Sequence, residues 1–208
     1  MDYRQRIIEE AAHMFRTYGI RAVTMDMLAN QMSISKRTIY EVFADKEELL
    51  AGVIDWMTVR QKETLARVLS ESENVIEVVF RMLDLMESHI NRMSPAFLLD
   101  MKRLHEKVMK MPEIRDNFPY MSSNIEILKR GIAEGVFRND IDIDLTNKCM
   151  LEVVKMTHDQ KVFPPDNYTN IDIVKNFYLN YLRGISTQKG LTLIEQYENS
   201  GILSQKHL

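Results

Sequence analysis

A long stretch without helix-breaking residues limits the folds that this sequence can adopt. Between Val53 and Ser94 there is neither glycine nor proline, and the 208 residues include only 7 Gly and 5 Pro. Sheets rich in hairpins need these residues at their turns, whereas long helices exclude them from their interiors. The pattern therefore predicts an all-α protein.

Stop and start signals divide the N-terminal part into three helices. The first has apolar residues at helical spacing and ends at Gly19, whose backbone suits a helix stop. Thr24 caps a short second helix, and Ser35 caps a third that runs from Lys36 to Phe43. A short turn separates the second helix from the third.

A longer helix is expected next, because Asp45 and Glu48 form a capping box that opens it. Its apolar stripe continues from about Lys46 to Leu69, which is long enough to connect two domains. Further helices are expected near 75–92, 96–110, 114–134, 144–160 and 170–186, and a short helix or frayed tail at 191–203.

Composition excludes several classes of protein. With 45% hydrophobic residues the chain can form a packed core. No apolar run approaches the length of about 18 residues typical of a membrane span, and the charged start does not resemble a signal peptide. We therefore expect a cytoplasmic protein. Cys149 is the single cysteine, which rules out an internal disulfide and a cysteine-based zinc site.

The sequence holds no pattern typical of an enzyme. It lacks the H-E-x-x-H, G-x-S-x-G, phosphate-loop and dinucleotide-binding motifs, and Cys149 has no evident base beside it. We accordingly expect no catalytic residues, no metal and no cofactor.

The second and third helices, with their tight turn, form a helix-turn-helix, the motif that lays its second helix in the major groove. At about 100° per residue, Ile39, Val42 and Phe43 fall on one side of that helix, which we expect to be buried. Arg37 and Glu41 fall on the opposite, outward side.

The outward side chains suit DNA. The planar fork of Arg37 matches the two acceptors of a guanine edge, and Thr38 suits a thymine methyl or a base edge. Glu41 lies one turn from Arg37, so the two form either a preorganised pair, with Glu41 accepting from a cytosine amino group, or a solvated salt bridge. Further DNA contacts, mainly to phosphates, are expected from Thr24, Ser35, Lys36, Tyr40 and Lys46.

From Ala11 to Leu50 the sequence resembles the tetracycline-repressor (TetR) family of bacterial transcription regulators. Many relatives carry glycine where Arg37 stands, and a basic or aromatic residue where Glu41 stands. The residues that stand at the family's spacing are Phe15, Gly19, Thr24, Ile39, Tyr40, Phe43, Lys46 and Leu49.

The resemblance implies a DNA-binding domain at 1–47 and a helical ligand-binding and dimerisation domain at 48–208. It also implies that the last two long helices, near 144–160 and 170–186, form a homodimer. The expected function is that of a ligand-responsive repressor, which binds a palindromic DNA operator and is released by a small, largely apolar effector.

Residues of the middle helices form the expected effector pocket. Methionine and aromatic side chains at helical spacing suit an apolar ligand, although they fill irregular cores equally well. The expected lining is Met86, Phe97, Met101, His105, Phe118, Met121 and Ile125.

The charge balance of the N-terminal part indicates that DNA binding depends on a few specific contacts rather than on nonspecific electrostatic attraction. Residues 1–48 hold seven bases and eight acids. Nonspecific binding should therefore be weak, and specific binding should depend on dimerisation. The alternative is a helical protein-interaction module whose helix-turn-helix is purely structural.

Overall fold

The computed structural model describes residues 2–108, 120–156, 162–164 and 167–200. Within these ranges every regular element is a helix, apart from one isolated bridge between Phe137 and Ser186, so the all-α prediction is confirmed. The chain forms two compact units, one of residues 1–63 with 91–118 and one of residues 64–90 with 119–208. This division differs from the predicted ranges 1–47 and 48–208.

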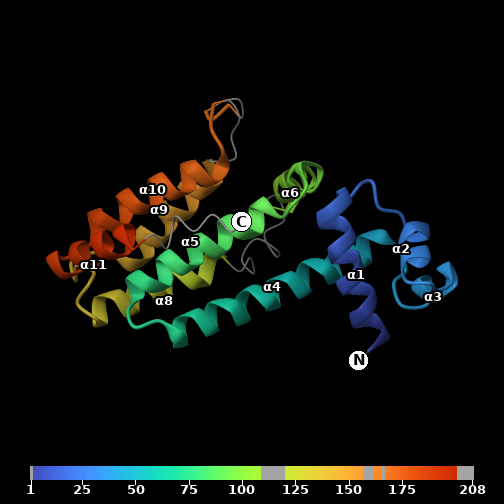
Figure 1. Ribbon diagram of the computed structural model, residues 1–208, viewed down its shortest axis with the longest axis horizontal. Coiled ribbons are helices and arrows are strands. Elements are labelled where there is room, and N and C mark those ends of the chain that lie inside the picture. The colour runs from blue at the N-terminus through green and yellow to red at the C-terminus, as the bar shows by residue number, and fades with distance from the viewer. Residues whose placement is uncertain (1, 109–119, 157–161, 165–166, 201–208) are drawn as a thin grey trace. The chain divides into compact units, whose positions relative to one another are not determined.

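The N-terminal unit contains α1 (Tyr3–Tyr18), α2 (Met25–Gln31), α3 (Lys36–Tyr40), α6 (Pro95–Val108) and the first part of α4 (Lys46–Glu71). Figure 1 shows α1, α2 and α3 grouped at this end of the chain. The apolar faces of these helices share one core, whose largest fully buried side chains are Ile7, Phe15, Leu28, Ile39, Phe43, Leu49 and Phe97.

Local signals explain where these helices begin and end. The Gly19 backbone has φ 90° and donates to the Phe15 carbonyl, which closes α1. At the start of α4 the Glu48 amide donates to Asp45 Oδ1 at 2.8 Å, while the Glu48 carboxylate accepts from the Ala44 amide at 2.6 Å. The predicted capping box is therefore present, with its return bond one residue earlier than the usual pattern.

The helix α3 is shorter than predicted. It ends at Tyr40 rather than at Phe43, because the chain tightens there: the Val42 amide donates to the Ile39 carbonyl three residues back, at 3.0 Å. Phe43 still donates to the Ile39 carbonyl at 2.9 Å and remains fully buried. The buried face is kept, although the last residues are a turn.

The C-terminal unit contains α5 (Val75–Asn91), α8 (Tyr120–Ala133), α9 (Ile143–Met156), α10 (Asn170–Ile185) and α11 (Gln188–Asn199), together with the end of α4. The helices expected near 75–92 and 170–186 are present, and the C-terminal stretch is a helix rather than a tail. Parts of the helices expected at 96–110, 114–134 and 144–160 lie outside the described residues. The apolar faces of the helices in the C-terminal unit form a second core, around Val75, Phe80, Leu128, Phe137, Leu182 and Ile194.

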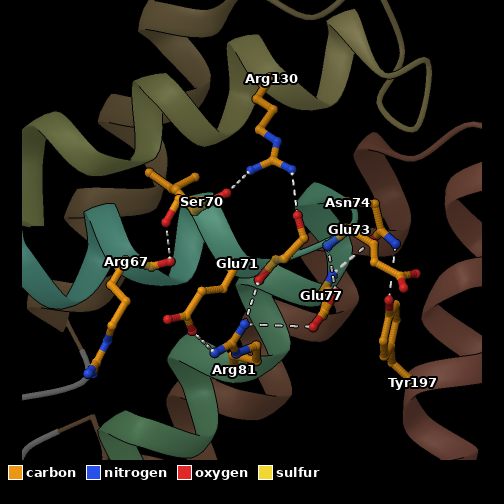
Figure 2. A network of polar contacts seen from close by, with 11 residues as sticks. Arg67, Ser70, Glu71, Glu73, Asn74, Glu77, Arg81, Arg130 and Tyr197 are labelled. Atoms are coloured by element: carbon orange, nitrogen blue, oxygen red, sulfur yellow. Dashed lines mark hydrogen bonds and ion pairs between the residues drawn. The ribbon is translucent and has the colours of Figure 1, made fainter.

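A network of polar contacts fixes the corner between α4 and α5 (Figure 2). The Arg130 guanidinium, on α8, donates to the Leu69 and Ser72 carbonyls at the end of α4. It also pairs with Glu134 one turn later, whose carboxylate accepts from the Val75 amide at the start of α5, at 2.7 Å. One ion pair therefore satisfies backbone groups at both helix ends, which would otherwise lack partners.

Candidate functional site

The turn between α2 and α3 sets the angle of the helix-turn-helix. Ser33 has φ 55°, the left-handed conformation that residues other than glycine rarely adopt. The following residue, Ile34, donates to the Ala29 carbonyl at 3.0 Å and closes the turn. The caps flank it, because Thr24 Oγ1 accepts from the Met27 amide at 3.1 Å and Ser35 Oγ accepts from the Thr38 amide at 3.0 Å.

The helix α3 has the predicted orientation. Ile39 and Phe43 are fully buried, whereas the side chains of Arg37 and Glu41 are 88% and 60% exposed. Tyr40 is also exposed. An exposed polar face held by a buried apolar face is what entry into the major groove requires. That these side chains contact DNA remains a prediction.

Both cations at the start of α3 already have acidic partners. Arg37 Nε donates to Glu41 Oε1 at 3.0 Å, and Lys36 Nζ donates to Asp26 Oδ2, on α2, at 2.7 Å. The hydrogen bond to Asp26 raises the pKa of the Lys36 ammonium, which also lies 5.9 Å from the Tyr40 ring centroid. Asp26 was not among the predicted site residues, although its place in the first turn of α2 is evident in the sequence.

Lys46 has a structural role at the loop before α2. Its ammonium donates to the Val23 carbonyl and, at 3.4 Å, to the Arg21 carbonyl. Partial burial lowers the pKa of this group. The predicted phosphate contact would therefore compete with two backbone carbonyls for the same donor.

The helix α6 holds the same loop from another side, which the sequence alone did not indicate. Asp100 is almost fully buried and accepts from the Arg21 amide at 2.9 Å, with the Arg21 Nε at 3.7 Å. The Ser94 amide donates to the Arg16 carbonyl at 2.9 Å, so the start of α6 also meets the end of α1. The two segments approach closely because Gly19 has no side chain: a Cβ at this position would lie only 3.0 Å from the Ala96 Cβ.

Where the structure describes them, the expected effector-pocket residues are divided between the two units. Phe97 and Met101 pack in the core of the N-terminal unit, whereas Met86 packs against the core of the C-terminal unit. Ile125 is half-buried on α8. Phe118 lies outside the described residues, as do the side chains of His105 and Met121.

The C-terminal unit contains a small cavity between its helices. Its lining comes from α5, α8, α9, α10 and the turn after α8, and it is mostly apolar. The lining residues are Val79, Asn124, Ile127, Leu128, Phe137, Met150, Tyr178, Tyr181, Leu182 and Ile185. Of the expected pocket residues whose side chains the structure describes, Met86, Phe97, Met101 and Ile125, none lines this cavity.

Two phenols and one amide supply the polar groups of this cavity. The Tyr178 hydroxyl donates to Asn124 Oδ1 at 3.3 Å, whereas the buried Tyr181 hydroxyl has no hydrogen-bond partner in the described part of the chain. Burial raises the pKa of both phenols, that of Tyr181 to about 12, so both are neutral at ordinary pH. Tyr181 is thus a free donor in an apolar setting.

Other kinds of site have no support in the residues that the structure covers. No group of histidine, cysteine and carboxylate side chains there could hold a metal ion. None of the helices in the described ranges combines enough length and apolar character to cross a bilayer.

Comparison with known proteins agrees with this arrangement. A family model described as "Bacterial regulatory proteins, tetR family" matches residues 7–53. The HTH-type transcriptional repressor KstR2 of Mycobacterium tuberculosis is 26% identical over 193 residues, which cover 90% of this chain and 94% of that protein. The solved structure of that "ketosteroid transcriptional regulator" covers 90% of this chain and 96% of its own, with a TM-score of 0.54 and 22% identity.

A second solved structure is similar over the same range. The Thermus thermophilus FadR, a transcriptional repressor in complex with lauroyl-CoA, has a TM-score of 0.61 and 19% identity. The alignment covers 89% of this chain and 96% of that one. At this level of identity the likeness concerns the fold.

The exposed face of α3, its buried anchor and the second helical unit define a helix-turn-helix transcription regulator, a class of DNA-binding proteins rather than enzymes. Residues 7–53 match the model of the tetR family of bacterial regulatory proteins, and the chain is similar over most of its length to the repressor KstR2.

Proposed function

We propose that this protein is a homodimeric repressor that binds a palindromic operator and leaves it when a small, largely apolar effector binds. The orientation of α3 carries the proposal: Ile39 and Phe43 are buried, and Arg37 and Glu41 lie in solvent. Caps at Thr24 and Ser35 hold this face in place. The repressor KstR2, similar over most of its length, supports the direction of the effect.

An apolar face on α9 supports the homodimer. Leu145 is 59% exposed and Met156 is 44% exposed, and the exposed Cys149 lies between them at helical spacing. Exposed apolar side chains along one helix face are costly in water and are typical of interfaces. To read two half-sites on one face of the duplex, such a dimer needs its two copies of α3 about 34–36 Å apart, one helical turn of DNA.

The dimer is tested by light scattering on the full chain. Leu145→Asp places a charge in the proposed interface and should raise the dimer dissociation constant at least about tenfold. The matched control is Leu98→Asp, since Leu98 is 38% exposed on α6, in the other unit. A dimer equally stable in both variants would refute the α9 interface.

The cavity of the C-terminal unit has a volume of only about 10 Å³ in this structure, room for about one water molecule, so an effector would have to open it. Its lining nevertheless suggests the chemistry of the effector. Its described lining residues are apolar apart from Tyr178, Tyr181 and Asn124, and none of them is charged. A neutral molecule with a carbonyl or hydroxyl oxygen would satisfy the Tyr181 hydroxyl. The relatives are consistent with a largely apolar effector, since one is a ketosteroid regulator and another binds lauroyl-CoA, whose acyl chain is apolar although its coenzyme A part is charged.

DNA binding is tested by selection of duplexes from a random pool with the full chain. The expected result is an enriched palindrome, bound in fluorescence anisotropy by two chains for each duplex. If no sequence is enriched, the proposal is wrong and a protein-interaction module becomes the better reading.

The effector is tested on the enriched duplex with a ketosteroid and with lauroyl-CoA as probes. A probe that releases the DNA should need a higher concentration with Tyr181→Phe, since the variant lacks the unpaired donor. Tyr18→Phe is the control, because Tyr18 is 54% exposed in the N-terminal unit. Equal sensitivity of both variants would exclude the cavity as the site of that probe.

A further inference from the structure

The Arg37–Glu41 pair has a geometry that divides the donors of the arginine. A guanidinium carries five N–H groups, one on Nε and four on the two terminal nitrogens. Glu41 Oε1 accepts from Nε at 3.0 Å, so the contact uses the side of the guanidinium. The terminal nitrogens remain available as a fork with two parallel donors.

Glu41 also keeps an unused acceptor. Its Oε1 accepts from Arg37, and the side chain is 60% exposed, so Oε2 is accessible to a donor. An ionised carboxylate accepts hydrogen bonds and cannot donate them. The pair therefore presents two donors and one acceptor side by side on the outward face of α3.

The neighbouring polar side chains of α3 are already engaged. Lys36 is bound to Asp26, and the Thr38 hydroxyl lies 2.7 Å from Ser35 Oγ. Arg37 is the most exposed of the ion-paired side chains that the structure describes in this unit, at 88%. Among these groups the Arg37–Glu41 pair is the best placed to meet a base edge.

A G·C base pair presents the complementary pattern in the major groove. Guanine offers two acceptors, O6 and N7, and the paired cytosine offers the N4 amino donor on the same edge. An A·T pair places a donor on adenine and a methyl group on thymine instead. Of the two kinds of base pair, only G·C is complementary to the two donors of Arg37 followed by the acceptor of Glu41.

We propose that Arg37 and Glu41 together read one G·C base pair in each operator half-site, with guanine held by the Arg37 fork and cytosine N4 donating to Glu41. This inference rests on the proposed DNA-binding function and deepens it. The salt bridge fixes the plane of the guanidinium before binding, so less conformational entropy is lost on contact. Glu41 thus sets specificity both directly and by positioning Arg37.

The test starts from the palindrome enriched by the wild-type full chain. Anisotropy titrations then compare that duplex with duplexes in which each base pair of both half-sites is changed in turn. The variants are Arg37→Ala, Arg37→Lys, which keeps the charge without the fork, and Glu41→Ala. The matched control is Arg138→Ala, because Arg138 also forms an exposed pair, with Asp140 at 3.2 Å, in the other unit.

One G·C position should lose its preference in the variants. Wild-type protein should prefer G·C there by about 10- to 100-fold, and Arg37→Ala should bind all four base pairs there about equally. Compared with Arg37→Ala, Arg37→Lys should regain overall affinity for the duplex but not the full preference for G·C, since lysine lacks the fork. Glu41→Ala should relax the preference with a smaller loss of affinity, and Arg138→Ala should match the wild type.

Two outcomes would overturn the proposal. Uniform weakening by Arg37→Ala at every position would make Arg37 a phosphate contact, and no change would make the pair a solvated salt bridge. In both cases the wild type still enriches a palindrome, so the proposed function would stand. Absence of any enriched sequence would overturn both. Circular dichroism confirms folding, which the exposed positions of both residues should leave intact.

Discussion

Two Arg–Glu ion pairs in different regions of this molecule differ in exposure and in the groups that they bind. On α3 the side chains of Arg37 and Glu41 are 88% and 60% exposed, whereas those of Arg130 and Glu134 in the C-terminal unit are only 28% and 24% exposed. The first pair has donors left over for another molecule. The second pair uses its donors and acceptors on the backbone of two helix ends.

The difference shows how burial distinguishes an ion pair that can bind another molecule from one that stabilises the fold. An exposed pair contributes little to stability, because water competes for both partners, and it can exchange a partner at little cost. A half-buried pair bonded to backbone groups is costly to break, because it leaves those groups without partners. The following substitutions test this separation, beginning with the largest expected effect.

Arg130→Ala should lower the free energy of unfolding by about 2–4 kcal/mol, since it removes the donors to Leu69 and Ser72 and leaves Glu134 without its partner. Urea denaturation at fixed protein concentration measures it. The matched control, Arg138→Ala, should cost less than about 0.5 kcal/mol, because its pair with Asp140 is more than half exposed. Similar losses in both variants would mean that exposure does not separate the two kinds of pair.

Asp100→Ala should cost about 1–3 kcal/mol, because the Arg21 amide loses its buried acceptor. Asp100→Asn keeps an oxygen for that amide and should recover part of the loss. The same denaturation experiment measures both variants. Equal losses would indicate that charge, rather than the hydrogen bond to the loop, holds α6 in place.

Local structure around α3 could be predicted because it depends on residues close together in the sequence. The caps at Thr24 and Ser35, the turn and the buried side of α3 all follow from residues a few positions apart, and the structure has them as predicted. The end of α3 was placed at Phe43 rather than at Tyr40, because periodicity does not distinguish a helix from the tight turn that continues its buried face.

Contacts between distant segments could not be predicted in the same way. Phe97 and Met101 have the spacing of a pocket-lining stripe, but the periodicity gives no information about which core the stripe meets, and α6 packs with the N-terminal unit. Tyr178 and Tyr181 have the spacing of a core or dimer face, and only the fold places them at a cavity with Asn124. The role of Asp100 likewise depends on its hydrogen bond with the Arg21 amide, 79 residues away in the sequence.

Ser33→Gly should raise the free energy of unfolding by about 0.5–1 kcal/mol, because glycine adopts a positive φ without strain, although its freer unfolded state offsets part of the gain. Thermal unfolding checks the expected gain. The base preference of α3 should stay unchanged, which would separate backbone strain from recognition. Destabilisation would mean that the Ser33 side chain makes a contribution larger than its backbone strain.

Asp26→Asn should have the smallest effect on stability, because water competes for both exposed partners, and a clear effect on nonspecific DNA binding. The Lys36 ammonium loses the partner that neutralises it, so it becomes free for a phosphate. Affinity for an unrelated duplex at low salt should rise by about 2- to 5-fold, and the slope of log affinity against log salt should steepen by about 0.9, as for one added phosphate contact. Asp140→Asn, in the C-terminal unit, should change neither quantity. If Asp26→Asn left the salt slope unchanged, Lys36 would not contact phosphate, and the acidic partners on α2 and α3 would not be what keeps nonspecific binding weak.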